Sequence, residues 1–163
     1  MSPKTATFWP ILAGVLLTDC ATKQIAVDHL MPAYSPHDVI GSLIRFTLAF
    51  NPGAAFSMSL GSASRWGFTI AAVVALAVLG LAFWKAKPDD IPQSVALALI
   101  TGGALGNLAD RLRSARGVVD FIDMGIGDVR FWTFNVADMG VTCGAALLVW
   151  VLWHRGTGSE ELG

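Results

Sequence analysis

Two aspartates, Asp120 and Asp138, stand 18 residues apart beside a strongly apolar stretch of the chain. Asp138 ends the run Phe134-Asn135-Val136-Ala137-Asp138 and leads directly into the uncharged residues 139–153. A carboxylate at the end of a membrane span is costly, so its presence there indicates a function. Two carboxylates that meet can share one proton and act as acid and base on a water molecule. This pair therefore predicts acid–base chemistry at the end of a membrane span.

The composition of the chain indicates a membrane protein. Its 163 residues allow one domain, and 54% are hydrophobic while 14% are charged, against about 25% charged in soluble domains. The mean hydropathy is +0.59. The net charge of −1 argues against a nucleic-acid partner. We therefore expect a single integral membrane domain over residues 1–163.

The thiols and imidazoles of the chain show no metal-ligand spacing. There are two cysteines, Cys20 and Cys143, and three scattered histidines. We expect no metal and no organic cofactor, because paired carboxylates need neither. Both cysteines lie near the outer ends of predicted spans, so a disulfide is conceivable, but free cysteine commonly behaves as a small buried apolar residue.

Four apolar stretches predict four membrane-spanning helices. Gly67–Trp84 has 18 residues without a charge, about 27 Å of helix against a hydrocarbon core of about 30 Å. It has no polar face to turn toward water, which disfavours a soluble helical core. In the first stretch Asp19 and Lys23 are four residues apart and can pair. The other stretches are about Phe8–Val27, Pro92–Leu108 and Asn135–His154.

The beginning of the chain resembles a secretory signal peptide. Lys4 precedes an apolar run from Phe8 to Leu17. A lipoprotein cleavage box, however, has a small neutral residue before its cysteine, and Asp19 stands before Cys20. We interpret this segment as a retained first span.

Two longer connections, about Asp28–Arg65 and Arg111–Phe134, lie on the same side of the predicted bundle. Within the first, Ile44–Phe50 alternates with the period of a half-buried strand and runs into the turn signal Asn51-Pro52-Gly53. The second contains short β-like pieces at 117–122 and 129–132. Because an open strand edge cannot face lipid, we expect a small sheet at the membrane interface.

Polar residues gather at the end of the bundle beside these two connections. For any single residue, a helix end is a sufficient explanation. It explains the amides less well, because each borders an apolar segment and a buried amide needs hydrogen-bond partners, which a bound peptide backbone could supply. We interpret Asp110–Arg111 as an ion pair or as a helix end whose charged groups snorkel to the membrane surface, and Asp123 and Asp128 as solvated loop residues. The set comprises Asp19, Lys23, Asn51, Asn107, Asp110, Arg111, Asp120, Asn135 and Asp138.

Five motifs in chain order carry a family resemblance. The chain resembles the lipoprotein signal peptidases (signal peptidase II), which are bacterial membrane aspartic proteases. Together the motifs extend over residues 19–138, and five in the family's order are highly specific. The motifs are Asp19-Cys20-Ala21-Thr22-Lys23, Asn51-Pro52-Gly53-Ala54-Ala55-Phe56-Ser57, Gly103-Ala104-Leu105-Gly106-Asn107-Leu108-Ala109-Asp110-Arg111, Gly117-Val118-Val119-Asp120-Phe121 and Phe134-Asn135-Val136-Ala137-Asp138.

The resemblance implies an all-α membrane protein with four transmembrane helices and a small extracytoplasmic β-sheet platform. It implies a place in the bacterial cytoplasmic (inner) membrane, cytoplasmic termini and an active site on the periplasmic or extracellular side. The implied activity is an aspartic endopeptidase that removes the signal peptide from diacylglyceryl-modified prolipoproteins by cleaving before the lipidated cysteine. Asp120 and Asp138 would be the catalytic pair.

The same resemblance assigns the remaining site residues. It implies that Asn51, Gly53, Asn107, Arg111 and Asn135 bind the substrate, and that Asp19, Lys23 and Asp110 are structural polar residues. The partners would be the prolipoprotein, membrane lipid and a globomycin-type inhibitor, and we expect a monomer.

Two other classes of protein also fit part of the pattern. A proton-coupled carrier or channel subunit would have intramembrane charged residues, but here they gather at one end and Gly67–Trp84 has no polar lining. A membrane scaffold without enzymatic activity would leave the clustered amides and aspartates unexplained. Cleavage of a lipidated lipobox peptide distinguishes the three.

The distribution of basic residues conflicts with the implied topology. The implied cytoplasmic side has four: Lys4, Lys85, Lys87 and Arg155. The other side has seven: Lys23, Arg45, Arg65, Arg111, Arg113, Arg116 and Arg130. The positive-inside rule alone therefore favours the opposite orientation. We follow the resemblance, because Lys23 and Arg111 belong to its motifs.

Overall fold

Four helices form the body of the protein. The computed structural model describes residues 1–53 and 62–160; at 62–64 and 156–160 it describes the backbone alone. All four helices are long and apolar enough to cross a membrane, so the four predicted spans are confirmed. Three extend beyond their predicted ranges at both ends, and the fourth begins one residue later than predicted and extends beyond its predicted end. They are α1 (Pro3–His29), α2 (Ser62–Lys85), α3 (Ile91–Arg113) and α4 (Val136–Glu160).

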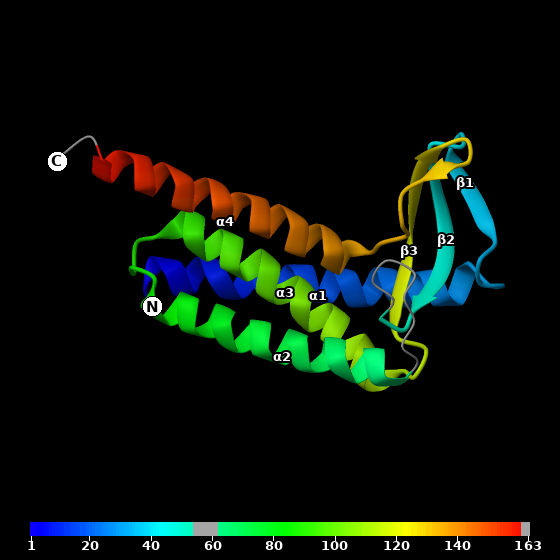
Figure 1. The fold of residues 1–163 in the computed structure, drawn as a ribbon, viewed down its shortest axis with the longest axis horizontal. Coiled ribbons are helices and arrows are strands. Elements are labelled where there is room, and N and C mark those ends of the chain that lie inside the picture. The colour runs from blue at the N-terminus through cyan, green and yellow to red at the C-terminus, as the bar shows by residue number, and fades with distance from the viewer. Residues whose placement is uncertain (54–61, 161–163) are drawn as a thin grey trace.

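Helix α3 packs against each of the other three helices (Figure 1). Small residues allow its close approach to α1 and α4. A Cβ on Gly103 would overlap the carbonyl oxygen of Ala137 in α4, and a Cβ on Gly102 would lie 3.0 Å from the carbonyl oxygen of Leu12 in α1. Close backbone contact of this kind stabilises helix pairs in lipid, where the hydrophobic effect between helices is absent.

A four-stranded antiparallel sheet lies across one end of the bundle, and both chain ends lie at the other end (Figure 1). The expected sheet platform is confirmed, and the alternating segment forms its second strand. Strand β1 was not predicted from the sequence. The strands are β1 (Pro36–Ile40), β2 (Ile44–Asn51), β3 (Val118–Ile126) and β4 (Val129–Arg130), in that spatial order.

A buried apolar cluster joins the sheet to the helices. Ala26 near the outer end of α1 packs with Leu48 of β2 and Phe121 of β3. Because side chains alternate along a strand, Asp120 points away from this cluster while Phe121 enters it. The cluster therefore fixes the position of the strand that bears Asp120.

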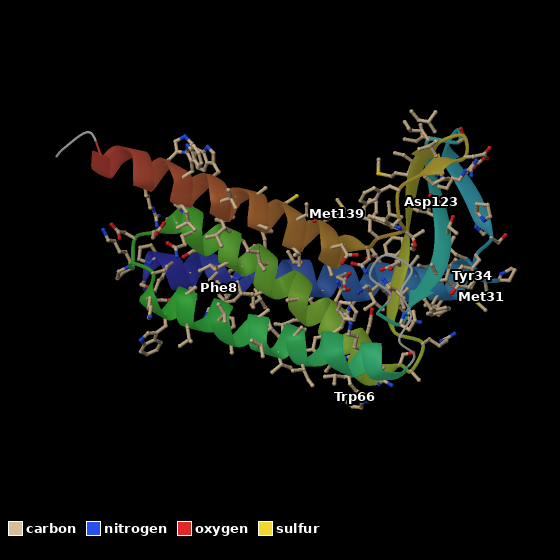
Figure 2. The ribbon with its side chains drawn as sticks, in the orientation of Figure 1. Phe8, Met31, Tyr34, Trp66, Asp123 and Met139 are labelled. Carbon is tan, nitrogen blue, oxygen red and sulfur yellow. The ribbon has the colours of Figure 1, made fainter. Side chains whose placement is uncertain are left out.

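Asp123 is an exception to the sequence interpretation. It is 7% exposed and lies on β3 within the sheet (Figure 2), so its assignment as a solvated loop residue was wrong. Its carboxylate accepts hydrogen bonds from Arg130 Nε at 2.7 Å and Thr47 Oγ1 at 3.1 Å. Arg130 also donates to the carbonyl oxygen of Ser42 at 2.7 Å. Asp128 lies in the exposed turn between β3 and β4, as expected.

Candidate active site

The segment before α4 is held against β3, and this brings the two aspartates together. The backbone N–H groups of Phe121 and Ile122 donate to the carbonyl oxygen of Phe134 at 3.0 and 2.8 Å. The N–H of Phe134 donates back to the carbonyl oxygen of Ile122 at 3.0 Å. Asn135, the next residue, therefore lies beside Asp120, and Asp138 lies within the first turn of α4.

Asn135 and Asp138 cap the N-terminus of α4 reciprocally. Asn135 Oδ1 accepts from the backbone N–H of Asp138 at 2.9 Å, and Asp138 Oδ2 accepts from the backbone N–H of Asn135 at 3.2 Å. This is the arrangement of a capping box, which satisfies helix donors that have no partner within the helix. The positive end of the helix dipole also lies at this carboxylate.

The buried side-chain amide of Asn135 connects the two aspartates. Its Nδ2 donates to Asp120 Oδ1 at 2.7 Å and lies 3.1 Å from both the carbonyl oxygen of Val119 and Asn107 Oδ1. The side chain is 0% exposed. One asparagine therefore orients Asp120 through its nitrogen and caps the helix turn of Asp138 through its oxygen.

Asp120 is in an environment that favours its protonated form. It is 3% exposed, and burial together with the nearby charge of Asp138 raises its pKa from the ordinary 3.8 to about 7. Hydrogen bonds from Asn135 and Asn51, and the positive charge of Lys23, oppose this rise in pKa. Asn51 Nδ2 lies 3.4 Å from Asp120 Oδ2. A carboxyl group of this pKa can hold a proton near neutral pH.

Asp138 accepts hydrogen bonds on both of its carboxylate oxygens. Besides the cap bond, Asn107 Nδ2 donates to Asp138 Oδ1 at 2.7 Å. The two acidic groups of the site thus have different surroundings: Asp120 is buried on a strand, whereas Asp138 lies at a helix N-terminus and accepts from two donors. Such a difference in surroundings is found in pairs of carboxyl groups that act as acid and base.

Arg111 is the cation that faces the pair from α3. Its charge acts on Asp138, Asp120 and Asp110. One guanidinium nitrogen donates to the carbonyl oxygen of Asn107 at 3.3 Å, and the guanidinium lies 5.7 Å from the ring centroid of Phe68. Among the described residues no acceptor reaches its buried Nε. Of the two alternatives for Asp110–Arg111, the structure shows no ion pair between them: Asp110 pairs with Lys23.

Lys23 lies at the centre of a buried charged cluster next to the pair. Its ammonium group is 2.8 Å from Asp19 Oδ2 and 2.9 Å from Asp110 Oδ2, so the predicted pairing with Asp19 is confirmed. Asp19 Oδ1 also accepts from the backbone N–H of Ala137 in α4 at 2.9 Å. Asp110 Oδ2 accepts from the backbone N–H of Val119 at 3.2 Å. Asp19 therefore binds α4, and Asp110 binds β3, on either side of the site.

Asn51 and Gly53 form the turn that follows β2. The backbone N–H of Gly53 donates to Asn51 Oδ1 at 3.0 Å, and Gly53 has a φ of +103°, which a side chain would strain. A Cβ there would also lie 2.7 Å from a ring carbon of Phe68. The turn directs the other end of the Asn51 amide toward Asp120. The rest of this motif, residues 54–57, lies outside the described residues.

Three groups that shape the site were not predicted from the sequence. Gly106 has room for no Cβ, because one would overlap the carboxylate of Asp19. The other two are the backbone N–H groups of Ala137 and Val119, which bind Asp19 and Asp110. The spacing Asn-x-x-Asp directly before an apolar run was a readable sign of the helix cap. Both cysteines are free, with Cys20 half-buried and Cys143 exposed.

Comparison with known proteins places this architecture among bacterial membrane enzymes. A family model described as signal peptidase (SPase) II matches residues 11–154. A lipoprotein signal peptidase of Geobacter sulfurreducens is 40% identical over 149 residues, covering 91% of this chain and 92% of the relative. One of Coxiella burnetii is 38% identical, covering 91% and 93%. A solved structure of a bacterial membrane enzyme aligns with a TM-score of 0.83 and 32% identity, covering 94% of this chain and 91% of the other. A second aligns with a TM-score of 0.79 and 33% identity, covering 90% of this chain and 92% of the other.

Proposed function

This chain belongs to the signal peptidase II family, a family of peptidases that remove signal peptides from prolipoproteins, and we propose that it does so as an aspartic endopeptidase with Asp120 and Asp138 as its catalytic pair. The observation that supports this most strongly is the set of hydrogen bonds of Asn135. Its side-chain nitrogen donates to Asp120, its side-chain oxygen accepts from the backbone N–H of Asp138, and its backbone N–H donates to the Asp138 carboxylate.

We assign the starting proton to Asp120 on the basis of its surroundings. Its pKa of about 7 keeps it protonated in acidic solution and partly protonated at neutral pH. Asp138 then acts as the base. It takes a proton from a water molecule as the water oxygen attacks the carbonyl carbon of the scissile peptide bond. Asp120 gives its proton to the carbonyl oxygen, so the tetrahedral intermediate is an uncharged gem-diol.

Collapse of the gem-diol returns both carboxyl groups to their starting forms. Asp138 gives its proton to the amide nitrogen as the carbon–nitrogen bond breaks. Asp120 takes back a proton from one hydroxyl group as the carbonyl re-forms. The products are the carboxyl end of the signal peptide and the free amine of the lipidated cysteine. The sequence of steps consumes one water molecule and leaves the enzyme unchanged.

The hydrogen bonds of the site divide the remaining polar residues into two groups. Asn107 and Asn135 donate to the catalytic carboxylates, so they orient the pair. Arg111 and Gly53 remain for the substrate backbone, with Asn51 at the boundary because it contacts Asp120 only at 3.4 Å. A guanidinium group beside the pair would bind a peptide carbonyl and stabilise negative charge that develops there.

The position of the site explains why the substrate is lipidated. The pair lies where the sheet meets the outer end of the helices, so a cysteine at this level can keep its diacylglyceryl group in the bilayer while its peptide bond reaches the aspartates. We place this end on the periplasmic or extracellular side of the bacterial cytoplasmic membrane, with both termini in the cytoplasm. A globomycin-type cyclic peptide would occupy the same site, and the protein would act as a monomer.

Cleavage of a defined peptide tests this function. The purified protein in lipid is incubated with two lipobox peptides of identical sequence, one with a diacylglyceryl group on its cysteine and one without. We expect cleavage of the lipidated peptide alone, at the bond before the cysteine, as read by product mass. Cleavage at another bond, or equal cleavage of the unlipidated peptide, would contradict the proposed specificity. A carrier or scaffold would cleave neither.

A further inference from the structure

Lys23 has a third contact that charge neutralisation does not require. Besides Asp19 and Asp110, its ammonium group donates to Asn107 Oδ1 at 2.9 Å. An ammonium group has three hydrogens and no acceptor, so these three partners use all of its donors. Lys23 is 4% exposed, which leaves water little access to replace any of them.

The contact decides which end of the Asn107 amide faces the catalytic pair. Asn107 Oδ1 accepts from Lys23 and from Asn135 Nδ2, and Asn107 Nδ2 therefore points at Asp138 Oδ1. The two ends of an amide have nearly the same shape, so donors and acceptors around it determine its orientation. In the reversed orientation, the amide NH₂ would face the ammonium group and the amide oxygen would face the carboxylate.

We propose that Lys23 is a positioning residue for catalysis: it holds the Asn107 amide in the one orientation that donates to Asp138, and so directs the free lone pairs of Asp138 toward the attacking water. The inference rests on the proposed function of the pair. Because the hydrogen bond from Lys23 is charge-assisted, it also polarises the amide and strengthens the bond from Asn107 Nδ2 to Asp138.

A purely structural role for Lys23 predicts something different. In that case the lysine only neutralises Asp19 and Asp110, which hold α4 and β3. Replacing Lys23 alone would then leave two buried carboxylates without a cation, and lost activity would say nothing about positioning. The charged groups facing this region are Asp19 on α1, Asp110 and Arg111 on α3, Asp120 on β3 and Asp138 on α4.

A neutral version of the cluster separates the two roles. The variant combines Lys23→Met with Asp19→Asn and Asp110→Asn, because asparagine keeps an acceptor oxygen for the N–H groups of Ala137 and Val119. Single-turnover cleavage of the lipidated peptide and thermal unfolding are measured from pH 5 to 9, beside wild type and the surface control Asp128→Asn.

We expect the neutral variant to fold and to reach half-saturation at a similar substrate concentration, while its cleavage rate falls about 10- to 100-fold, the effect of one lost hydrogen bond to a charged group. A folded neutral variant that cleaves at the wild-type rate would overturn the proposal.

Lys23→Arg provides the second measurement, and it keeps the charge of the cluster if the neutral variant does not fold. Arginine keeps the charge and the donors, so we expect cleavage within about tenfold of wild type and an unmoved pH profile. A folded Lys23→Arg protein whose rate falls more than 100-fold would overturn the proposal. Failure of the wild-type chain to cleave contradicts the proposed function, whereas equal cleavage by wild type and the neutral variant contradicts only the role of Lys23.

Discussion

At the level of single residues, the site depends on amide groups as much as on carboxyl groups. Asn107 donates to Asp138, Asn51 approaches Asp120, and Asn135 connects both aspartates. Each amide is itself fixed by another polar group, so the lone pairs of the carboxylates are directed before substrate binds. Preorganisation of this kind lowers the reorganisation that the reaction needs.

The first prediction concerns the catalytic pair. Asp120→Asn or Asp138→Asn removes one acid–base group with little change in size, and each should lower the single-turnover cleavage rate roughly 10⁴-fold or more. The double variant should be about as slow as either single variant, because the two groups act as one unit. Asp128→Asn, in the exposed turn, is the matched control and should cleave normally. Near-normal cleavage by either single variant would refute the aspartic mechanism.

The second prediction concerns pH. The acid step needs a proton on Asp120, whose pKa is about 7, so cleavage should decline as the pH rises through about 7. The rate is measured by single turnover from pH 5 to 9, with enzyme in excess over substrate and above the half-saturation concentration. A rate that stays constant up to pH 9 would show that Asp120 does not supply this proton.

The same pKa shift predicts a stability change of known sign. The folded protein holds this proton up to about pH 7, whereas the unfolded chain loses it near 3.8, so the free energy of unfolding contributed by Asp120 falls as the pH rises between those values. Asp120→Asn removes this loss. We therefore expect the difference in unfolding temperature, variant minus wild type, to be larger at pH 8 than at pH 5.

At the level of elements, the bond between Asp123 and Arg130 joins β3 to β4 and, through Thr47 and Ser42, to β2 and the turn before it. The third prediction is that Asp123→Asn lowers the free energy of unfolding by about 1–3 kcal/mol, because it weakens hydrogen bonds to a buried charged group. Asp128→Asn is the control and should change it by less than about 0.5 kcal/mol. Equal effects of the two changes in thermal unfolding would contradict this role.

The fourth prediction concerns the contact of α3 with α4. Gly103→Ala places a methyl group against the carbonyl oxygen of Ala137, and should cost about 1–3 kcal/mol of stability by overpacking. It should also reduce cleavage, because Ala137 lies one residue before Asp138. Gly80→Ala in α2 has nothing within 4 Å of its new methyl group and serves as the control. It should be neutral or stabilising by up to about 1 kcal/mol. Equal unfolding temperatures for the two variants would contradict the prediction.

Elements that follow from local pattern were predictable from the sequence. The four apolar stretches became helices, and the alternation of Ile44–Phe50 became β2. Features that depend on partners distant in the chain were not: Asp123 is buried because Arg130 and Thr47 lie across strands, and Asp110 pairs with Lys23, 87 positions away, instead of its neighbour Arg111. Strand β1 was missed because its side chains are all exposed and leave no alternation.

At the level of the whole molecule, the sheet and the site lie at one end of the bundle and the chain termini at the other (Figure 1). The fifth prediction is that a reporter fused to the C-terminus reports the cytoplasm, although the positive-inside rule alone favours the reverse. Two of the basic residues that create the conflict, Lys23 and Arg111, lie beside Asp120 and Asp138, so the proposed site accounts for their position. Periplasmic activity of the reporter would invert the proposed topology.

The double use of Asn135 has a consequence for drug resistance. An inhibitor that binds through this amide, or through the carboxylates it orients, contacts groups that also begin α4. A substitution at Asn135 that weakened such an inhibitor would remove a bond from Asp120 and the cap from the turn of Asp138. Bacteria escaping the inhibitor by this route would lose lipoprotein maturation with it. Resistance would have to arise at parts of the binding surface that the catalytic pair does not share.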